Sequence, residues 1–397
     1  MPEIHLWKPG PVGSGVRRAG DGLRAGVRGV TPCLLVGVLL DVRRAAALSV
    51  GEWDLLLRQA RRANLIARLD EAIAEAGVPV PEPARWHLSA ARSVAQAQRE
   101  RMQWEITCVA QALSGVTDTC VVLKGGAYLA LGLPLAASRL YGDLDILVPK
   151  PDLERVESAL TIHGWYVERL SAYDERYYRR WMHELPPMRH RRRGTALDVH
   201  HTLLPLTSRT ALVTPALFED LRPLDAWPGL STFAPPDLLL HSATHLFHEG
   251  EFANGLRDLF DLDALVRQHG TDRGYWDRTI ERAGRLGLRR PLHYALRHSE
   301  RALGTPVPPE VQRELARSAP SWPVPAVLDA CYDRALQPQH PSCETPGAPA
   351  ARLALYLRSH WLRMPLPLLV RHLARKAWRR LSGAELREQE AAQRQAG

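Results

Sequence analysis

The sequence predicts an α+β protein in which a small mixed sheet forms the core and helical regions flank it on its N- and C-terminal sides. Three observations predict this class. Over residues 46–115, apolar residues recur every three or four positions, which is typical of amphipathic helices. Over residues 116–215, short β-branched runs alternate with helical stretches, which is typical of a compact mixed unit. Over residues 216–397, the helical pattern returns.

Residues 1–45 differ from the rest, because they are rich in glycine, arginine and proline and show little periodicity. We expect them to form a poorly ordered leader. The whole chain has 397 residues and a formal net charge of +9. This positive balance suits anionic partners such as nucleotides, nucleic acid or a membrane surface, without choosing among them.

The sequence gives no clear sign of a nucleic-acid-binding or membrane-spanning protein. No RNA-recognition signature is present, and the basic turn at 189–193 is explained equally well as a solvated hairpin tip. The apolar stretch TPCLLVGVLLDV is shorter than the roughly 20 residues that span a bilayer. Five scattered cysteines without CxxC spacing argue against a disulfide framework and a zinc knuckle. We therefore expect a cytoplasmic protein without a transmembrane segment.

The strand-like segment RLYGDLDILV, residues 139–148, carries two candidate metal ligands. Residues two apart in a strand point the same way, so Asp143 and Asp145 share one face, while Leu144 and Ile146 line the other. Neighbouring carboxylates repel each other unless a cation neutralises them, and oxygen ligands suit Mg²⁺ or Mn²⁺. Taken alone, the segment also fits two solvated aspartates at the end of a strand.

A second candidate segment, VVLKGGAYLALG at 121–132, reads as a strand, a glycine pair and a helix. Gly125 and Gly126 allow the backbone to approach a ligand closely, and the free N–H groups at a helix start favour phosphate. Lys124 offers a compact positive charge for a phosphate group. An ordinary strand-to-helix turn also commonly uses glycine.

A third carboxylate, Asp198, lies in the strand-like segment GTALDVHHTLL with His200 on its own face. Brought beside the first two aspartates, Asp198 would complete a site for two metal ions, as in-line phosphoryl or nucleotidyl transfer requires. We consider His200 an accessory candidate that hydrogen-bonds near the metals. The alternative for Asp198 alone is a surface residue near a hairpin.

Three histidines, His241, His245 and His248, recur along one stripe of a predicted helix. The zincin pattern needs a glutamate directly after the first histidine, and this chain lacks it. Packing, or hydrogen bonding to Asp258 or Asp261, is therefore favoured over metal binding for this stripe.

Together, the segments LKGGAYL, RLYGDLDILV, ALDVHHTLL and DLLLHSATHLFHEGEFANGLRDLFDLDALV resemble the polymerase-beta-like nucleotidyltransferase superfamily. The chain looks most similar to its bacterial group of uncharacterised nucleotidyltransferases, over most of residues 50–300. The resemblance implies helices around a small catalytic unit, Mg²⁺ or Mn²⁺ as cofactor, and a nucleoside triphosphate (NTP) as substrate.

The resemblance also implies a role for each matching residue. The implied metal ligands are Asp143, Asp145 and Asp198, the residues facing the triphosphate are Gly125 and Gly126, and the phosphate partners are Lys124 and Arg139. The chain departs from the wider superfamily, which usually has Gly-Ser where this sequence has Gly125-Gly126. A serine hydroxyl that contacts phosphate elsewhere in the superfamily is therefore missing.

These observations predict a metal-dependent nucleotidyltransferase that moves a nucleoside monophosphate from an NTP to an unidentified acceptor. The acceptor group would be a hydroxyl or phosphate of a small molecule, peptide or protein. Two alternatives stay open: transfer of another phosphate-bearing group, and a non-catalytic nucleotide-binding scaffold on the same fold. A scaffold does not need three mutually repelling carboxylates, so the intact set favours catalysis.

Overall fold

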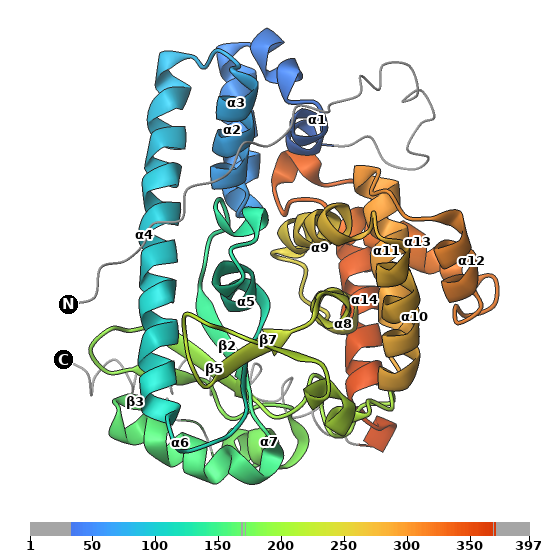
Figure 1. Ribbon diagram of the computed structural model, residues 1–397. Helices are drawn as coiled ribbons and strands as arrows, with labels where there is room; N and C mark the ends of the chain where they lie inside the picture. The colour runs from blue at the N-terminus through green and yellow to red at the C-terminus, as the bar shows by residue number, and fades with distance from the viewer. Residues whose placement is uncertain (1–32, 168–169, 171, 368, 371–397) are drawn as a thin grey trace.

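A single mixed sheet of seven strands lies at the centre of the molecule, in the order β3-β4-β5-β2-β1-β7-β6, with helices around it (Figure 1). The computed structural model describes residues 33–167, 170, 172–367 and 369–370. The strands are β1 (Cys120–Val122), β2 (Asp143–Leu147), β3 (Trp165–Val167), β4 (Met188–His190), β5 (Ala196–His200), β6 (Leu221–Pro223) and β7 (Leu230–Phe233). This arrangement confirms the predicted α+β class.

Helices make up most of the described chain on both sides of the sheet. Those before the second strand are α1 (Leu34–Leu40), α2 (Val50–Arg62), α3 (Ile66–Ala76), α4 (Glu82–Leu113) and α5 (Lys124–Ala130). Those between strands are α6 (Leu153–Ile162) and α7 (Ala172–Trp181). The remainder are α8 (Pro235–His248), α9 (Gly255–His269), α10 (Arg273–Leu286), α11 (Arg289–Leu303), α12 (Pro309–Ala316), α13 (Val324–Ala335) and α14 (Ala348–Arg363).

Strand β2 lies in the middle of the sheet, antiparallel to β1 and parallel to β5. The register pairs Asp145 with Asp198 across β2 and β5. Leu144 and Ile146 are almost completely buried, as are Leu197 and Val199 of β5. The period-two alternation therefore buries the leucine, isoleucine and valine side chains and leaves the aspartates together on the opposite face.

The long helix α4 runs along one side of the molecule and supports both the N-terminal helices and the sheet (Figure 1). From α4, the buried Glu105 accepts two hydrogen bonds from Arg193, at 2.6 and 2.9 Å. The Arg193 guanidinium also lies over the ring of Trp165. At least one arginine of the basic turn at 189–193 therefore anchors the β4–β5 hairpin to α4.

Part of the expected leader is ordered structure. Helix α1 lies within residues 1–45, and its Leu35 and Val36 are buried in the core. The Leu35 amide also donates to Gln59 Oε1 of α2 at 2.9 Å. The expectation of poor order is therefore wrong from residue 33 onward, because the short apolar run packs against α2; residues 1–32 lie outside the described residues.

The sheet continues past residue 215, where the sequence suggested only helices. Strand β7 pairs in parallel with β1, with Val121 opposite Ser231, and β6 forms the edge beside β7. Such short strands give no periodic signal, since they are stabilised by pairing with a strand more than 100 residues earlier. The proposed division into regions otherwise stays a prediction.

The C-terminal helices gather on the side of the sheet opposite α4, with α8 between the sheet and the others (Figure 1). Within the described part of the chain, no helix is both long and apolar enough to cross a membrane. Helix α14 packs against α13 and α8.

Candidate active site

The three predicted aspartates meet on the polar face of β2 and β5. One carboxylate oxygen each from Asp143, Asp145 and Asp198 lies within 4.8 Å of the others. The parallel pairing of β2 with β5 produces this convergence, because it sets Asp145 directly beside Asp198. Asp143 is exposed, whereas only 3% of the Asp145 surface is accessible to solvent.

Asp145 is the most strongly paired carboxylate of the three. Its Oδ1 lies 2.9 Å from the Lys124 ammonium and 3.1 Å from His200 Nε2. Burial raises the pKa of Asp145, but Lys124 and His200 outweigh burial and hold the pKa well below its usual range. Asp145 is therefore ionised at neutral pH, and the expected proximity of His200 to the carboxylate cluster is present.

Asp198 carries the unbalanced charge of the cluster. Burial and the neighbouring charges of Asp145 and Glu184 raise the pKa of Asp198 to about 7. The carboxylates therefore hold more negative charge than Lys124 and His200 neutralise, which is the electrostatic environment that a divalent cation fits. Because the donors are carboxylate oxygens, Mg²⁺ or Mn²⁺ suits them.

The glycine pair beside Lys124 packs tightly against the sheet and its neighbours. A side-chain carbon at Gly126 would lie 2.9 Å from both Leu144 Cδ1 and Val122 Cγ1, and one at Gly125 would collide with Arg139. This packing favours glycine at both positions, because a larger residue would displace the neighbouring side chains. A role for Gly125 and Gly126 toward the triphosphate stays a prediction.

Arg139 forms an internal ion pair in the structure. Its Nε donates to Asp261 of α9 at 2.9 Å, and the two side chains are only 11% and 7% exposed. The guanidinium also lies near the rings of Tyr128 and Tyr141. Arg139 therefore joins the segment before β2 to α9, and its role toward phosphate stays a prediction.

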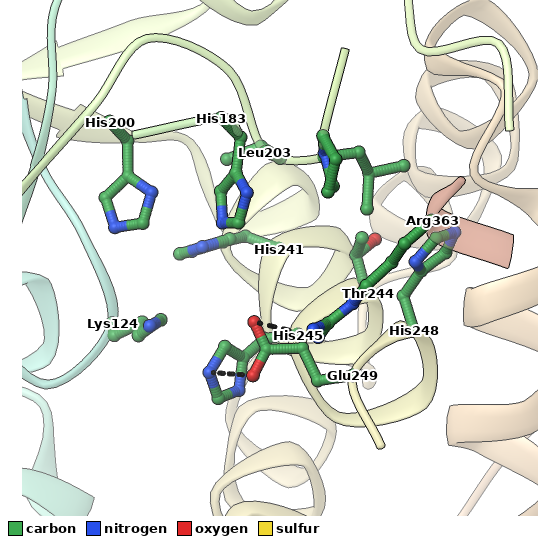
Figure 2. A pocket seen from close by; sticks show the side chains of 12 residues that line it. Lys124, His183, His200, Leu203, His241, Thr244, His245, His248, Glu249 and Arg363 are labelled. Carbon is green, nitrogen blue, oxygen red and sulfur yellow. Dashed lines mark ion pairs between the residues drawn. The ribbon is translucent and has the colours of Figure 1, made fainter. Parts of the chain in front are cut away.

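Two cavities lie near the carboxylates. The cavity of about 280 Å³ is lined by Gly142, which precedes Asp143, and by Ala196, which pairs with Asp143 across β2 and β5, but not by the aspartates themselves. Its lining residues are Gln98, Arg101, Met102, Glu105, Tyr141, Gly142, Arg189, Gly194, Thr195 and Ala196. The other is smaller and contains Lys124 and His200 together with side chains from α8 (Figure 2).

The histidine stripe of α8 lines the smaller cavity. His245 pairs with Glu249 at 3.2 Å and lies 3.9 Å from Asp258, as Figure 2 shows for the glutamate. His248 lies 3.1 Å from the Thr210 hydroxyl. His245 lies near Asp258 as predicted, but at a distance too long for the predicted hydrogen bond, and within the described residues the stripe does not form a group of metal ligands.

Sequence reasoning missed two residues near the carboxylates, His183 and Glu184. Glu184, which precedes β4 in the chain, forms an antiparallel β-bridge with His200 of β5. An adjacent His-Glu pair was the available signal, but no sequence spacing indicated that it lies next to β5.

The chain matches a family described as uncharacterised nucleotidyltransferase over residues 49–304. Neither the curated proteins nor the solved structures contain a significant match. The family match covers well over half of the chain, and it includes strands β2 and β5, which carry the carboxylates, and Lys124 at the start of α5. The chain therefore belongs to the family of uncharacterised nucleotidyltransferases.

Proposed function

We propose that the protein is a metal-dependent nucleotidyltransferase that moves a nucleoside monophosphate from an NTP to an acceptor hydroxyl or phosphate. The acceptor is a small molecule, a peptide or a protein. One observation carries the proposal: in a member of a nucleotidyltransferase family, Asp143, Asp145 and Asp198 converge on neighbouring parallel strands. Converging carboxylates with an excess of negative charge are suited to hold divalent cations beside a phosphate.

The three aspartates would hold Mg²⁺ or Mn²⁺, which when bound neutralises charge on the attacking and leaving oxygens. Asp198, with a pKa of about 7, is suited to accept the proton of an acceptor hydroxyl. The acceptor oxygen then forms a bond to the α-phosphorus, and the bond to the β-phosphate oxygen breaks. Pyrophosphate leaves with that electron pair.

The cavity beside Asp143 is the proposed place for the nucleotide. Its volume of about 280 Å³ approaches the size of small-molecule sites. Arg101 and Arg189 supply positive charge in its lining, and Tyr141 supplies an aromatic ring. These groups suit a ligand that combines a base with phosphates.

Thermal melting with each of the four NTPs, with and without Mg²⁺, tests this function. We expect one NTP to raise the melting temperature only when Mg²⁺ is present, because ligand binding to the native state stabilises it. The Asp143→Ala/Asp145→Ala variant should fold but lose this shift. A folded native protein that shows no shift with any NTP would contradict the proposal, and a shift without Mg²⁺ that the variant keeps would favour a nucleotide-binding scaffold.

Metal affinity should depend on pH through Asp198. A carboxylate must lose its proton to bind a metal, and the pKa of Asp198 is about 7. Below that pH, Mg²⁺ competes with a proton, so its affinity should fall by about tenfold per pH unit and become constant above pH 8. Isothermal titration calorimetry at pH 6, 7 and 8 measures this dependence of the Mg²⁺ affinity on pH. The Asp198→Asn variant should not show it. A Mg²⁺ affinity of the native protein that does not change with pH would contradict the prediction.

A further inference from the structure

A second group of metal-ligating side chains lies beside the aspartates, formed by His183, Glu184 and His200. Each of the three offers a ligand atom within 4.8 Å of the others. Unlike the aspartate cluster, the group combines two imidazoles with one carboxylate. Such a donor set suits first-row transition metals such as Zn²⁺, Co²⁺ or Fe²⁺ rather than Mg²⁺.

The distances within the group fit a shared ion better than they fit hydrogen bonds. Glu184 Oε2 lies 3.5 Å from His200 Nδ1 and 3.8 Å from His183 Nε2. Two ligands of a tetrahedral ion at its usual bond lengths of about 2.0–2.2 Å lie about 3.3–3.6 Å apart. The Glu184–His200 distance lies within this range and the Glu184–His183 distance exceeds it by a few tenths of an ångström, while all three ligand atoms lie within 4.8 Å of one another.

Within the described residues, two of the three side chains, His183 and Glu184, lack side-chain partners outside this cluster. His183 is 7% exposed, and among the described residues its imidazole makes no hydrogen bond; its Nδ1 is fully buried. The ion-pair partners of Glu184 in the described chain are the same two imidazoles, without a guanidinium or an ammonium. A half-buried carboxylate and a buried imidazole in this state cost free energy unless a cation binds them.

The backbone holds these side chains in place. The His201 amide donates to the His183 carbonyl at 2.8 Å, and the Leu185 amide donates to the Val199 carbonyl at 2.8 Å. Residues 183–185 are thus hydrogen-bonded to the end of β5, where the β-bridge sets Glu184 beside His200. Figure 2 shows the rings of His183 and His200 side by side, pointing into the same cavity.

His200 also joins this group to the aspartate cluster. Its Nδ1 faces Glu184, while its Nε2 lies 3.1 Å from Asp145 Oδ1. A carboxylate on the far nitrogen of a metal-binding histidine is the usual way in which proteins fix the ring and its tautomer. Burial also holds the pKa of His183 well below its usual range, so this imidazole is in the neutral form that binds metals.

We propose that His183, Glu184 and His200 bind a first-row transition-metal ion, separate from the oxygen-only aspartate site. Three protein ligands leave a coordination position open toward the cavity, as in catalytic metal centres. Lys124 and Arg363 also line that cavity. The open position therefore suits water or an anionic group of a substrate.

The test is a Co²⁺ titration of the metal-free, full-length protein in excess Mg²⁺, followed by visible absorption. Mg²⁺ fills oxygen sites, and Co²⁺ bound by nitrogen ligands at low coordination number absorbs far more strongly than hydrated Co²⁺. We expect one equivalent of strongly absorbing Co²⁺ that Mg²⁺ does not displace. His183→Gln should lose it, while His245→Gln, which removes another imidazole of the same cavity, should keep it.

Two further variants keep the test decisive if His183→Gln does not fold. Glu184→Gln preserves shape and should weaken Co²⁺ binding by more than the roughly 10- to 100-fold that loss of an outer partner costs. Asp145→Asn should weaken it about 10- to 100-fold through His200, whereas Asp143→Asn should leave it unchanged.

Two results would overturn the site. One is a native protein that binds no equivalent of Co²⁺ in excess Mg²⁺. The other is a folded His183→Gln or Glu184→Gln variant whose affinity for Co²⁺ is unchanged. Loss of Co²⁺ binding in His245→Gln would also overturn it and place the metal on α8. The site does not depend on the proposed nucleotidyl transfer, because the absorption of Co²⁺ reports metal binding without any NTP.

Discussion

Replacement of Asp145 by asparagine should abolish nucleotidyl transfer, lowering its rate by about 1,000-fold or more. Asparagine keeps the size of aspartate and one acceptor oxygen but removes the charge that would hold both metals. Loss of a single preorganised electrostatic contact in a catalytic site costs about 100- to 1,000-fold, and loss of metal binding removes several such contacts. The loss of transfer rate should therefore exceed that caused by any other single substitution near the smaller cavity, which contains Lys124 and His200.

The measurement is pyrophosphate release from the NTP that binds, in the presence of a fraction that contains the acceptor. Asp152→Asn is the matched control, since Asp152 hydrogen-bonds to Thr117 and Arg155 rather than to the aspartate cluster. It should retain the native rate. An Asp145→Asn enzyme that is folded and turns over at a rate close to the native rate would exclude the proposed role of this carboxylate.

Replacement of Arg139 by methionine should lower the free energy of unfolding by about 3–5 kcal/mol. The substitution leaves Asp261, which is 7% exposed, as a buried carboxylate without its guanidinium partner. Removing one member of a buried ion pair typically costs this amount, because the remaining charge is neither hydrated nor paired. Denaturation by urea, followed by circular dichroism, measures the change in stability.

Two further variants separate the buried ion pair from a general effect of losing arginine. Arg58→Met removes an ion pair with Asp54 in which the two side chains are 57% and 63% exposed, so it should cost only about 0–1 kcal/mol. Arg139→Met/Asp261→Leu removes both charges and should regain most of the lost stability. If Arg139→Met costs no more than Arg58→Met, the ion pair does not stabilise the fold as we propose.

The same double variant also tests the role of Arg139 toward phosphate. If the arginine acts only through Asp261, the double variant should bind NTP as the native protein does. A stable double variant that no longer binds NTP would assign Arg139 to the nucleotide. The free energy of unfolding thus reports the structural role of Arg139, and the affinity for NTP reports its role toward phosphate.

The sequence by itself determined the local character of the core. Alternation in β2 predicted that Asp143 and Asp145 share a polar face and that Leu144 and Ile146 are buried, because strand geometry depends on neighbouring residues alone. The spacing of apolar residues in the helices before and after the sheet is also a local pattern. The family match confirms the resemblance to nucleotidyltransferases. The sequence also singled out Asp198, although not its distance from the other aspartates.

Only the tertiary structure decided which distant residues meet. The parallel pairing of β2 with β5 set Asp145 beside Asp198, and packing against α9 gave Arg139 a partner 122 residues away. The bridge that brings Glu184 to His200 likewise depends on how two segments pair, which no local spacing records. Charge neutralisation and metal coordination act through space over a few ångströms, so these contacts followed from the fold and not from the order of residues along the chain.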